Sequence, residues 1–418
     1  MIHQVRSVFA LNQSVLVVIG MLFVALLLLA AVLAANTGLL ILQIGLQWVF
    51  SQAPQLQTSS GCDWPVESLT VVIPAYNESV NIEACLNSVL SSIPPSREWH
   101  VIVVDDASED DTFALARKAV GSHPCGDHLV QLVQAGPRPT GERWVGKNWA
   151  CTCAMEYVSS HWVLFIDADV RLKPDALRRA LVQAHQDKAD LLSLAPRLEC
   201  GCLAEWMVQP IMASLLGLGF PVVASNDPSS PVAFAAGPFM LFLRSSYEAI
   251  GGHRALAAEV VEDLALARGI KQAGLRLRYL LALDAVTLRM YENLSSLWEG
   301  WTKNWFLGLD RNVLRALGAA AAVVLMFSVP WINAVSALLL VVLFPTMAFW
   351  WWMVLTFSLL AVAQQLLLRL WTRQRFEVPI RYWWLMGLGG LLVGAIGPAS
   401  VWRTVTGRGW TWKGRALN

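Results

Sequence analysis

The stretch HWVLFIDAD, from His161 to Asp169, decides the fold that this sequence predicts. Its first six residues, His161 to Ile166, form an apolar run, which is typical of a strand buried in a parallel sheet. Two carboxylates, Asp167 and Asp169, follow where the strand gives way to a turn. In open α/β sheets, ligands bind at the carboxyl ends of the strands. The stretch therefore predicts a sheet and also the edge at which its site lies.

The segments around this stretch repeat the pattern of an apolar run with a polar end. Ser68 to Ala75 (SLTVVIPA) and Trp99 to Asp105 (WHVIVVD) are such runs, and His128 to Gln134 is a candidate third strand. Helical patterns follow the first two runs, over Glu78 to Ser92 and over Thr112 to Val120. Strands that alternate with helices favour a mostly parallel sheet with helices on both faces. We therefore predict an α/β domain in the middle of the chain.

Charge divides the 418-residue chain into three parts. Of its 30 acidic residues, 29 lie between Asp63 and Asp310, and the only acid in the flanks is Glu377. The hydrophobic content of 56% excludes a disordered chain, and the nearly uncharged flanks exclude an ordinary soluble protein. The middle is long enough for a folded domain, which argues against a multi-span transporter. We expect an anchor and linker over residues 1–62, a catalytic domain over 63–310 and a second membrane region over 311–418.

Apolar runs in the flanks predict membrane-spanning helices. Val15 to Ala35 is long enough for one span, with a cleaved signal peptide as the alternative. Leu39 to Phe50 is short for a second span, and a segment along the membrane interface is the alternative. Ala316 to Leu368 has room for two helices with a break near Pro345, and Tyr382 to Trp402 is a third uncharged run. We therefore expect an integral membrane protein.

Basic residues near these runs bear on the orientation, because cytoplasmic loops are enriched in Lys and Arg. One group follows the run that ends at Leu368, and another lies in the C-terminal tail. They are Arg369, Arg373, Arg375 and Arg381, then Arg403, Arg408, Lys413 and Arg415. Both groups are cytoplasmic only if the run over residues 382–402 does not cross the membrane, for example as a re-entrant hairpin. We expect the catalytic domain to face the cytoplasm.

Acidic residues at two strand ends carry the main functional signal. Asp167 and Asp169 can both reach one hard cation, and a Mg²⁺ or Mn²⁺ ion there would bridge to phosphate oxygens. Asp106 follows the second strand, where a carboxylate can accept hydrogen bonds from a base or a ribose. The alternative for such residues is helix capping, which we expect of Asp110 and Asp111 because they directly precede a helix. The sequence thus predicts a metal and nucleotide site.

Two lysines are candidate partners of a diphosphate. Lys147 lies in GERWVGKNWA, Gly141 to Ala150, where Gly146 permits a close approach of the backbone. The spacing of a P-loop is absent from this stretch. Lys303 lies in WTKNW, just before the C-terminal membrane run, and either closes over a diphosphate or places its ammonium group at the membrane interface.

An acidic pair, Glu262 and Asp263, opens the helical pattern of EVVEDLALAR. It supplies either a general base that deprotonates an acceptor hydroxyl or a charge complement to the helix N-terminus. The stretch AAGPF, Ala235 to Phe239, is a turn that either contacts substrate or is only structural. Both stretches lie in the charged middle of the chain.

Ordered motifs carry a resemblance to a known family. They are IPAYNE (Ile73 to Glu78), VVDDAS (Val103 to Ser108), IDADV (Ile166 to Val170), AGPF (Ala236 to Phe239), GGH (Gly251 to His253) and VED (Val261 to Asp263). The chain resembles a membrane-bound family 2 glycosyltransferase of the GT-A fold, a Rossmann-like mixed sheet, over roughly Ser68 to Asp310. WVGKNWAC (Trp144 to Cys151), LRMYENLSSLWEGWTKN (Leu288 to Asn304) and WKGR (Trp412 to Arg415) are similar to the carotenoid-glycosylating branch, the diaponeurosporenoate and myxol glycosyltransferases. Hopanoid-associated glycosyltransferases are also similar.

The resemblance implies a role for each site residue. Those on the nucleotide-sugar would be Pro74, Ala75, Tyr76, Glu78, Asp106, Lys147, Asp167 and Lys303. Asp167 and Asp169 would hold the divalent cation, and Asp263, beside Glu262, would be the catalytic base. Processive members carry Gln-x-x-Arg-Trp where this chain has Trp301 to Trp305 (WTKNW), which leaves the role of Lys303 open.

We therefore expect an inverting transfer of a single sugar, from a UDP-sugar or a related donor, to a hydroxyl or carboxyl group of a membrane lipid. A carotenoid is the expected acceptor, a hopanoid or another lipid is the alternative, and nucleic acid is not an expected partner. A processive polysaccharide synthase and an inactive nucleotide-binding scaffold are the competing hypotheses. The apolar segment Glu205 to Ala224 either lies on the membrane and admits the acceptor or is a core helix.

Overall fold

The computed structural model describes residues 2–58, 67–408, 411–413 and 415–416. The boundary expected at Asp63 and Gly414 of the WKGR motif lie outside the described residues. The chain divides into two units. A helical unit comprises Met1–Gln47, Cys202–Leu215 and Leu309–Thr406, and a sheet unit comprises Trp48–Gly201, Leu216–Gly308 and Gly407–Asn418. The C-terminal tail therefore belongs to the same unit as the candidate site.

A seven-stranded sheet forms the centre of the sheet unit and confirms the predicted α/β fold. In spatial order its strands are β3 (Val130–Gln134), β2 (Trp99–Asp105), β1 (Leu69–Ala75), β4 (Trp162–Ile166), β8 (Phe239–Leu243), β6 (Leu191–Ala195) and β9 (Leu277–Leu281). All neighbouring pairs are parallel except those of β8, which is antiparallel to β4 and to β6. Since β8 runs the other way, it begins beside the carboxyl end of β4.

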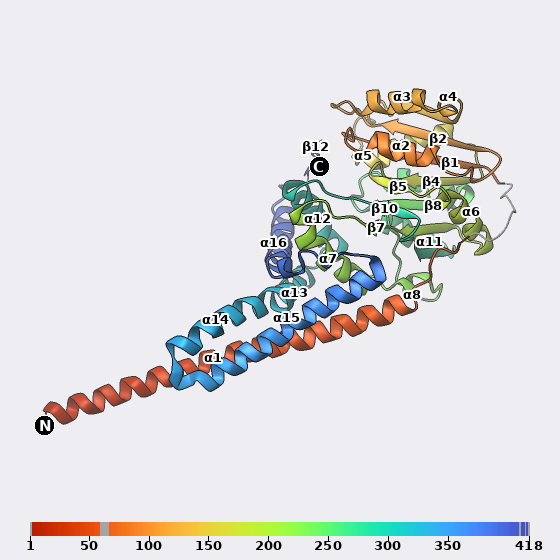
Figure 1. Ribbon diagram of the computed structural model, residues 1–418. Helices are drawn as coiled ribbons and strands as arrows, with labels where there is room; N and C mark the ends of the chain where they lie inside the picture. The colour runs from red at the N-terminus through yellow and green to blue at the C-terminus, as the bar shows by residue number, and fades with distance from the viewer. Residues whose placement is uncertain (1, 59–66, 409–410, 414, 417–418) are drawn as a thin grey trace. The chain divides into compact units, whose positions relative to one another are not determined.

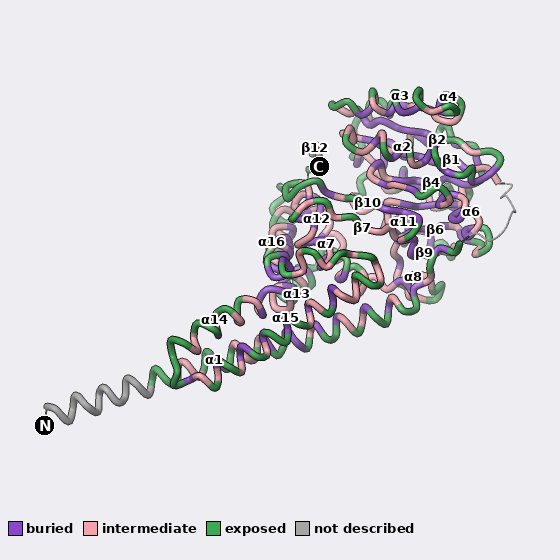
Figure 2. The backbone as a smooth tube through the Cα atoms, viewed as in Figure 1, coloured by how far each residue is buried: buried purple, intermediate pink, exposed green. Residues whose placement is uncertain are grey.

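Helices cover both faces of this sheet (Figure 1). One face packs against α2 (Ile82–Leu90), α3 (Thr112–Ser122) and α6 (Ala176–Gln186), and the other against α5 (Gly146–Ala154) and α11 (Glu262–Gln272). Successive side chains of a strand point to opposite faces. Apart from the edge strand β3, the strands are accordingly buried almost throughout, as Figure 2 shows in purple.

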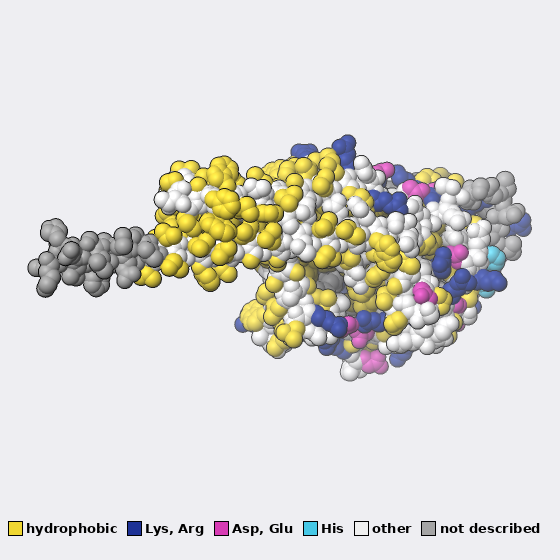
Figure 3. Space-filling view, turned by 90° about the horizontal axis from the view of Figure 1, so that it is seen from below, with side chains coloured by type: hydrophobic (Ala, Val, Ile, Leu, Met, Phe, Trp, Pro, Cys, Tyr) yellow, Lys and Arg dark blue, Asp and Glu magenta, His cyan; other side chains and the backbone are white. Residues whose placement is uncertain are grey.

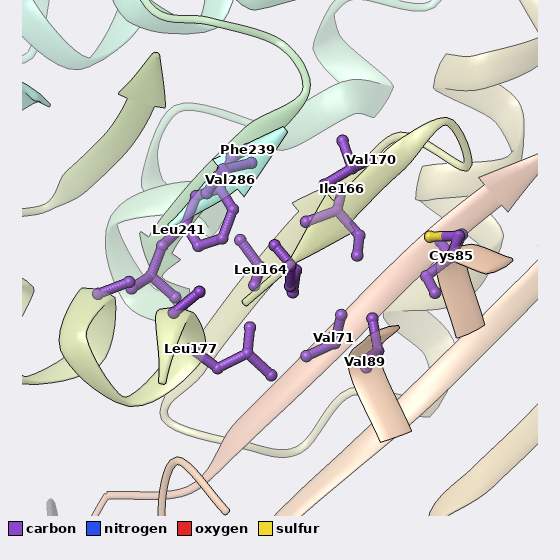
Figure 4. Close-up of a cluster of buried hydrophobic side chains, with 14 of the residues drawn as sticks. Val71, Cys85, Val89, Leu164, Ile166, Val170, Leu177, Phe239, Leu241 and Val286 are labelled. Atoms are coloured by element: carbon purple, nitrogen blue, oxygen red, sulfur yellow. The ribbon is translucent and has the colours of Figure 1, made fainter. Parts of the chain in front are cut away.

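Figure 4 shows the core on the first face, where Val71 of β1, Val89 of α2, Leu164 of β4 and Leu177 of α6 come together. Each of these four side chains is at most 1% exposed. Burial of this kind contributes roughly 1.5–3 kcal/mol for each large apolar side chain. A three-stranded sheet of β5 (Val170–Leu172), β10 (Val286–Leu288) and β7 (Arg197–Leu198) adds Val170 and Val286 to the same core.

The observed strands lie within a residue or two of the predicted ones, but α2 begins later than its helical pattern. The pattern starts at Glu78, whereas the helix starts at Ile82. The intervening loop is bonded to the loop after β2: the amide of Asn77 donates to Oγ of Ser108 (3.0 Å) and the amide of Glu78 to Oγ1 of Thr112 (2.7 Å). These contacts hold the polar end of β1 outside the helix and next to the end of β2.

Among the described residues, four helices are long and apolar enough to cross a membrane: Leu16–Ser51, Val313–Leu343, Pro345–Phe376 and Trp383–Val405. The second consists of α13 (Val313–Val323), a π-helical turn (Val324–Ser328) and α14 (Val329–Leu343). The third and fourth contain α15 (Ala348–Phe376) and α16 (Met386–Val405). Hydrophobic side chains cover the visible face of this unit in Figure 3. The predicted break near Pro345 is present between α14 and α15.

Residues 39–50 are the last part of α1, which runs unbroken from Ile2 to Ser51, so they form neither a second span nor a separate interfacial segment. Two polar residues near its middle are compatible with the helix since they bond to its own carbonyl groups. Nδ2 of Asn36 donates to the carbonyl oxygen of Val32 (2.8 Å), and Oγ1 of Thr37 donates to that of Leu33 (3.0 Å). A side chain bonded in this way does not interrupt the helical backbone.

The segment from Glu205 to Ala224 forms two helices, α7 (Leu203–Gly219) and α8 (Val222–Asn226). One face of α7 is buried, including the polar residues Glu205, Gln209 and Ser214. Gly389 of α16 lies against its backbone, where a Cβ atom would come within 2.1 Å of the carbonyl oxygen of Met207. This tight packing makes α7 a core element of the helical unit.

Candidate active site

The polar ends of β1, β2 and β4 meet at one edge of the sheet. The amide of Asp106 donates to the carbonyl oxygen of Ala75 at the end of β1 (2.9 Å), and Pro74 and Ala75 pair with the last residues of β2. The amide of Asp167 donates to the carbonyl oxygen of Pro238, the residue before β8 (3.4 Å). The structure thus brings the predicted IPAYNE, VVDDAS, IDADV and AGPF motifs together.

Lys147 links two of the predicted acidic groups. Its ammonium nitrogen lies 2.6 Å from Oδ1 of Asp167 and 2.7 Å from Oε1 of Glu262. Burial lowers the pKa of Lys147, but the carboxylates of Asp167 and Glu262 outweigh burial and hold this pKa well above its ordinary value. The ammonium group therefore stays charged at the centre of the site, within reach of any phosphate that binds between the two carboxylates.

Asp263 follows Glu262 in the first turn of α11. Its Oδ2 atom accepts a hydrogen bond from the amide of Gly237 (3.2 Å), and Oδ1 accepts one from the amide of Leu264 (2.7 Å). A Cβ atom at Gly237 would lie 2.9 Å from Oδ2, so a larger residue there would displace the carboxylate from this position. Burial, reinforced by the charge of Glu262, raises the pKa of Asp263 to about 6. This value suits a general base near neutral pH.

Asp169 is a second carboxyl group of the site with a raised pKa. Burial raises its pKa well above the ordinary value, and the charges of Asp167 and Glu78 raise it further. Its Oδ1 atom is buried without a hydrogen-bond partner among the described residues. A buried, unpartnered carboxylate oxygen fits a ligand of a hard cation. The described residues contain no cluster of three or more metal-binding side chains, so further ligands would have to come from substrate and water.

Asp106 is held by two arginines from distant parts of the chain. Its Oδ2 atom lies 2.7 Å from Nη2 of Arg138 and 2.5 Å from Nη1 of Arg415. Burial raises the pKa of Asp106, while both guanidinium groups oppose that effect. The guanidinium carbon of Arg415 also lies 3.8 Å from the centre of the Tyr76 ring, a cation–π contact.

The C-terminal tail brings a second cation to the same edge. Strands β11 (Thr411–Trp412) and β12 (Arg415–Ala416) pair as a hairpin. Nζ of Lys413 lies 2.7 Å from Oε1 of Glu78 and 2.8 Å from the carbonyl oxygen of Asn77. The hydroxyl group of Thr411 donates to Glu299 of α12 (Leu294–Gly308). The hairpin therefore places its two cations on predicted nucleotide-binding residues.

Lys303 is the remaining predicted cation. It lies on α12, where burial lowers its pKa while the charges of Glu262 and Asp263 raise it. The lysine is thus close enough to the acidic pair to interact with it electrostatically.

The two aspartates expected to cap α3 differ. Asp110 caps the helix, since its Oδ1 atom accepts from the amide of Thr112 (3.0 Å), and its Oδ2 atom accepts from the amide of Ser79 (3.1 Å). Asp111 occupies the N-cap position without a side-chain capping bond. Of the two, Asp110 alone fulfils the prediction.

Sequence reasoning missed three cations of this site: Arg138, Lys413 and Arg415. Arg138 lies just before the GERWVGKNWA stretch and has no distinctive motif. Lys413 and Arg415 lie in the WKGR motif, but their charges were interpreted as markers of membrane orientation. The motif itself was the signal that connects the tail with the site.

Comparisons with known proteins agree with this arrangement. Residues 70–251 match the family model described as glycosyl transferase family 2. Over 263 residues, 62% of this chain, the sequence is 30% identical to 4,4'-diaponeurosporenoate glycosyltransferase of Staphylococcus aureus strain N315 and 29% identical to that of strain USA300. The matched part spans 66% of the length of each relative, slightly less than two thirds.

One solved structure has a similar fold. It is a mannosyltransferase from Pyrobaculum calidifontis in complex with GDP-Man and Mn²⁺, with a TM-score of 0.50 and 19% identity, and the likeness covers 90% of this chain and 98% of that chain. At this identity the likeness supports the fold alone, which agrees with the predicted GT-A arrangement.

Proposed function

Because residues 70–251 belong to glycosyl transferase family 2, we propose that the chain transfers a single sugar from a nucleotide-sugar to a membrane lipid, with inversion at the anomeric carbon. The observation that carries the proposal is the Lys147 ammonium, which joins Asp167 of the strand-end motif to Glu262, next to Asp263. Lys147 thus connects Asp167, which we assign to the donor, with Glu262, the neighbour of the candidate base Asp263. The named relatives act on a carotenoid acid, which supports a carotenoid as the acceptor.

Asp263 takes the proton of the acceptor hydroxyl as its oxygen attacks the anomeric carbon, and the bond from that carbon to the diphosphate breaks. A carboxyl acceptor would attack as its carboxylate and would need no base. The two main-chain amides on Asp263 fix the direction of its carboxylate, and Gly237 lets the acceptor side of the site approach closely. General-base catalysis of this kind contributes about 10²- to 10⁴-fold in rate.

The donor diphosphate is held by charge. Lys147 and Lys303 lie next to the acidic pair, and Lys413 and Arg415 lie over the ends of β1 and β2. The nucleoside binds at Tyr76 and Asp106, which offer a ring face and a carboxylate. These cations offset the repulsion between the diphosphate and the many carboxylates at this edge.

A divalent cation fits the two carboxylates of the Asp-x-Asp motif. Asp169, with its unpartnered oxygen, and Asp167 would hold a Mg²⁺ or Mn²⁺ ion, and the absence of a third protein ligand among the described residues is typical of Mg²⁺ bound together with substrate phosphates. The similar mannosyltransferase structure contains Mn²⁺. When bound, the ion would neutralise charge on the leaving diphosphate.

We also propose that the catalytic unit faces the cytoplasm and that α16 does not cross the membrane. Residues on both sides of the segment Leu309–Thr406 belong to the sheet unit, so this segment crosses an even number of times. The break at Pro345 separates α14 from α15, and Figure 1 shows these two helices side by side. This arrangement supports a pair of crossings. The fourth candidate helix, which contains α16, then begins and ends on the side of the catalytic unit.

The direct test uses purified full-length protein in detergent with radiolabelled UDP- and GDP-sugars, Mn²⁺ and either a carotenoid acid or a hopanoid alcohol. We expect label in a lipid that carries one sugar. Label in a long polymer would indicate a processive synthase. Nucleotide-sugar binding without release of nucleoside diphosphate would indicate a non-catalytic binding protein.

A further inference from the structure

The segment next to the candidate base is apolar. Residues 232–238, VAFAAGP, run from the loop after α8 to the start of β8, and the amide of Gly237 in this segment donates to Asp263. Burial alternates along it: Val232, Phe234, Ala236 and Pro238 are partly exposed, whereas Ala233, Ala235 and Gly237 are buried. Alternation of this kind is typical of an extended chain with one open face. The open face carries no polar side chain.

Two aromatic residues, the partly exposed Phe220 and the buried Tyr279, pack against Phe234 of this face. Phe220 stacks on Phe234, with ring centres 4.6 Å apart and planes inclined by 23°. The rings of Tyr279 of β9 and Phe234 meet in a T-shaped arrangement, with centres 5.2 Å apart and planes inclined by 73°. Phe234, Ala236 and Tyr279 belong to one apolar cluster. We call Phe220, Phe234, Ala236 and Tyr279 the aromatic wall.

A single lysine holds the loop that precedes this wall. Nζ of Lys271 donates to the carbonyl oxygens of Ala224 (3.2 Å), Asp227 (2.8 Å), Ser230 (3.0 Å) and Val232 (2.5 Å). Lys271 lies in the last turn of α11, the helix that carries Glu262 and Asp263 in its first turn. One rigid helix therefore connects the candidate base with the segment that forms the wall.

We propose that the aromatic wall binds the apolar chain of the acceptor lipid next to its reacting oxygen, and that Lys271 sets the position of the wall relative to Asp263. The inference rests on the proposed function and names the surface that selects the acceptor.

The chemistry of the site assigns this surface to the acceptor rather than to the donor. The groups suited to a nucleotide and a diphosphate, Tyr76, Asp106 and the cations, lie at the ends of β1 and β2 and around Lys147. The wall offers no charge to a phosphate. An acceptor oxygen must reach Asp263, and its attached chain then meets the partly exposed Ala236 and Phe234, an apolar surface that suits an apolar molecule.

The test compares steady-state kinetics of full-length variants in detergent, with a carotenoid alcohol as the acceptor. Phe234→Ala should raise the KM for the acceptor about tenfold or more, since it removes a large apolar contact. The KM for the nucleotide-sugar and the slow hydrolysis of donor without acceptor should stay within about twofold. Lys271→Met should raise the acceptor KM in the same direction, and Lys271→Arg should restore it in part, because a cation again meets the carbonyl groups.

Phe113→Ala and Lys118→Met are matched controls on α3, away from the wall, and should change neither KM. An unchanged acceptor KM in both Phe234→Ala and Lys271→Met would overturn the inference. An equal loss in the acceptor KM, the donor KM and the melting temperature would also overturn it, since that pattern indicates general structural damage. Wild-type protein that releases no nucleoside diphosphate from any donor would contradict the proposed function itself, so the two failures are distinguishable.

Discussion

Arg415 donates from Nη1 to Oδ2 of Asp106, a residue 309 positions earlier in the chain. The same guanidinium group covers Tyr76, and Lys413 reaches Glu78. These contacts make the C-terminal hairpin part of the candidate donor site, although the hairpin follows the last apolar helix. They lead directly to a prediction about nucleotide affinity.

We expect Arg415→Ala to weaken the binding of UDP or GDP by about tenfold, because a charge-assisted contact in a half-buried site is lost. Lys413→Ala should act in the same direction with a smaller effect. Isothermal titration of the full-length protein with nucleoside diphosphate and Mn²⁺ measures both. Arg403→Ala, which removes a cation from α16 outside this site, is the control. Tighter binding in Arg415→Ala would show instead that the hairpin obstructs the site.

The pH dependence of the reaction should report Asp263. A base acts in its deprotonated form, which is fully populated above the pKa of about 6 and lost as the pH falls below it. We therefore expect kcat/KM for the acceptor to be level above about pH 7 and to fall about tenfold per pH unit well below 6. Since the charge of Glu262 helps to raise this pKa, Glu262→Gln should move the acid limb to lower pH. A wild-type profile that stays level to pH 5 would contradict the assignment.

Removal of the divalent cation should abolish transfer. We expect excess chelator to reduce the rate at least 100-fold and Mn²⁺ to restore it, since the ion offsets the charge of the leaving group. Asp169→Asn should weaken Mn²⁺ binding in the presence of nucleoside diphosphate, as measured by electron paramagnetic resonance. Asp175→Asn, a change at an exposed carboxylate before α6, is the control. Activity of Asp169→Ala at the wild-type level in chelator would exclude the metal role.

Membrane topology offers a separate prediction. An epitope inserted after Glu377 and another fused to the C-terminus should lie on the same side of the membrane, because α16 begins and ends on that side. Antibody access in intact spheroplasts and after permeabilisation measures this. We expect both epitopes to become accessible only after permeabilisation. Epitopes on opposite sides would show that α16 crosses.

Local patterns predicted most of the sheet and the part of the site that lies at strand ends. Asp106, Asp167 and Asp169 follow directly from strands, and Lys147 stands out between them, so short-range sequence was sufficient. Arg138 and Arg415 were not predictable in this way, since their common partner Asp106 is far away in the sequence. A basic residue near an apolar run either marks the orientation in the membrane or forms an ion pair. Only the fold distinguishes between these two roles.

Two further features depended on contacts that no periodicity reveals. Asn36 and Thr37 interrupt an apolar run, yet their side chains bond to carbonyl groups of the same helix and α1 continues. Lys271 has the pattern of an exposed helical lysine, yet its ammonium group gathers four carbonyl groups of a distant loop. Both features arise from hydrogen bonds to the backbone, which side-chain patterns do not encode.

The most direct test of the account is the rate at which Asp263→Asn transfers radiolabelled sugar to a lipid alcohol, compared with wild-type protein and with Asp227→Asn, a change at an exposed aspartate. We predict a loss of about 10²- to 10⁴-fold in kcat for Asp263→Asn, with the affinity for nucleoside diphosphate retained and the control unchanged. Full transfer by Asp263→Asn would contradict the central claim that this carboxylate removes the acceptor proton.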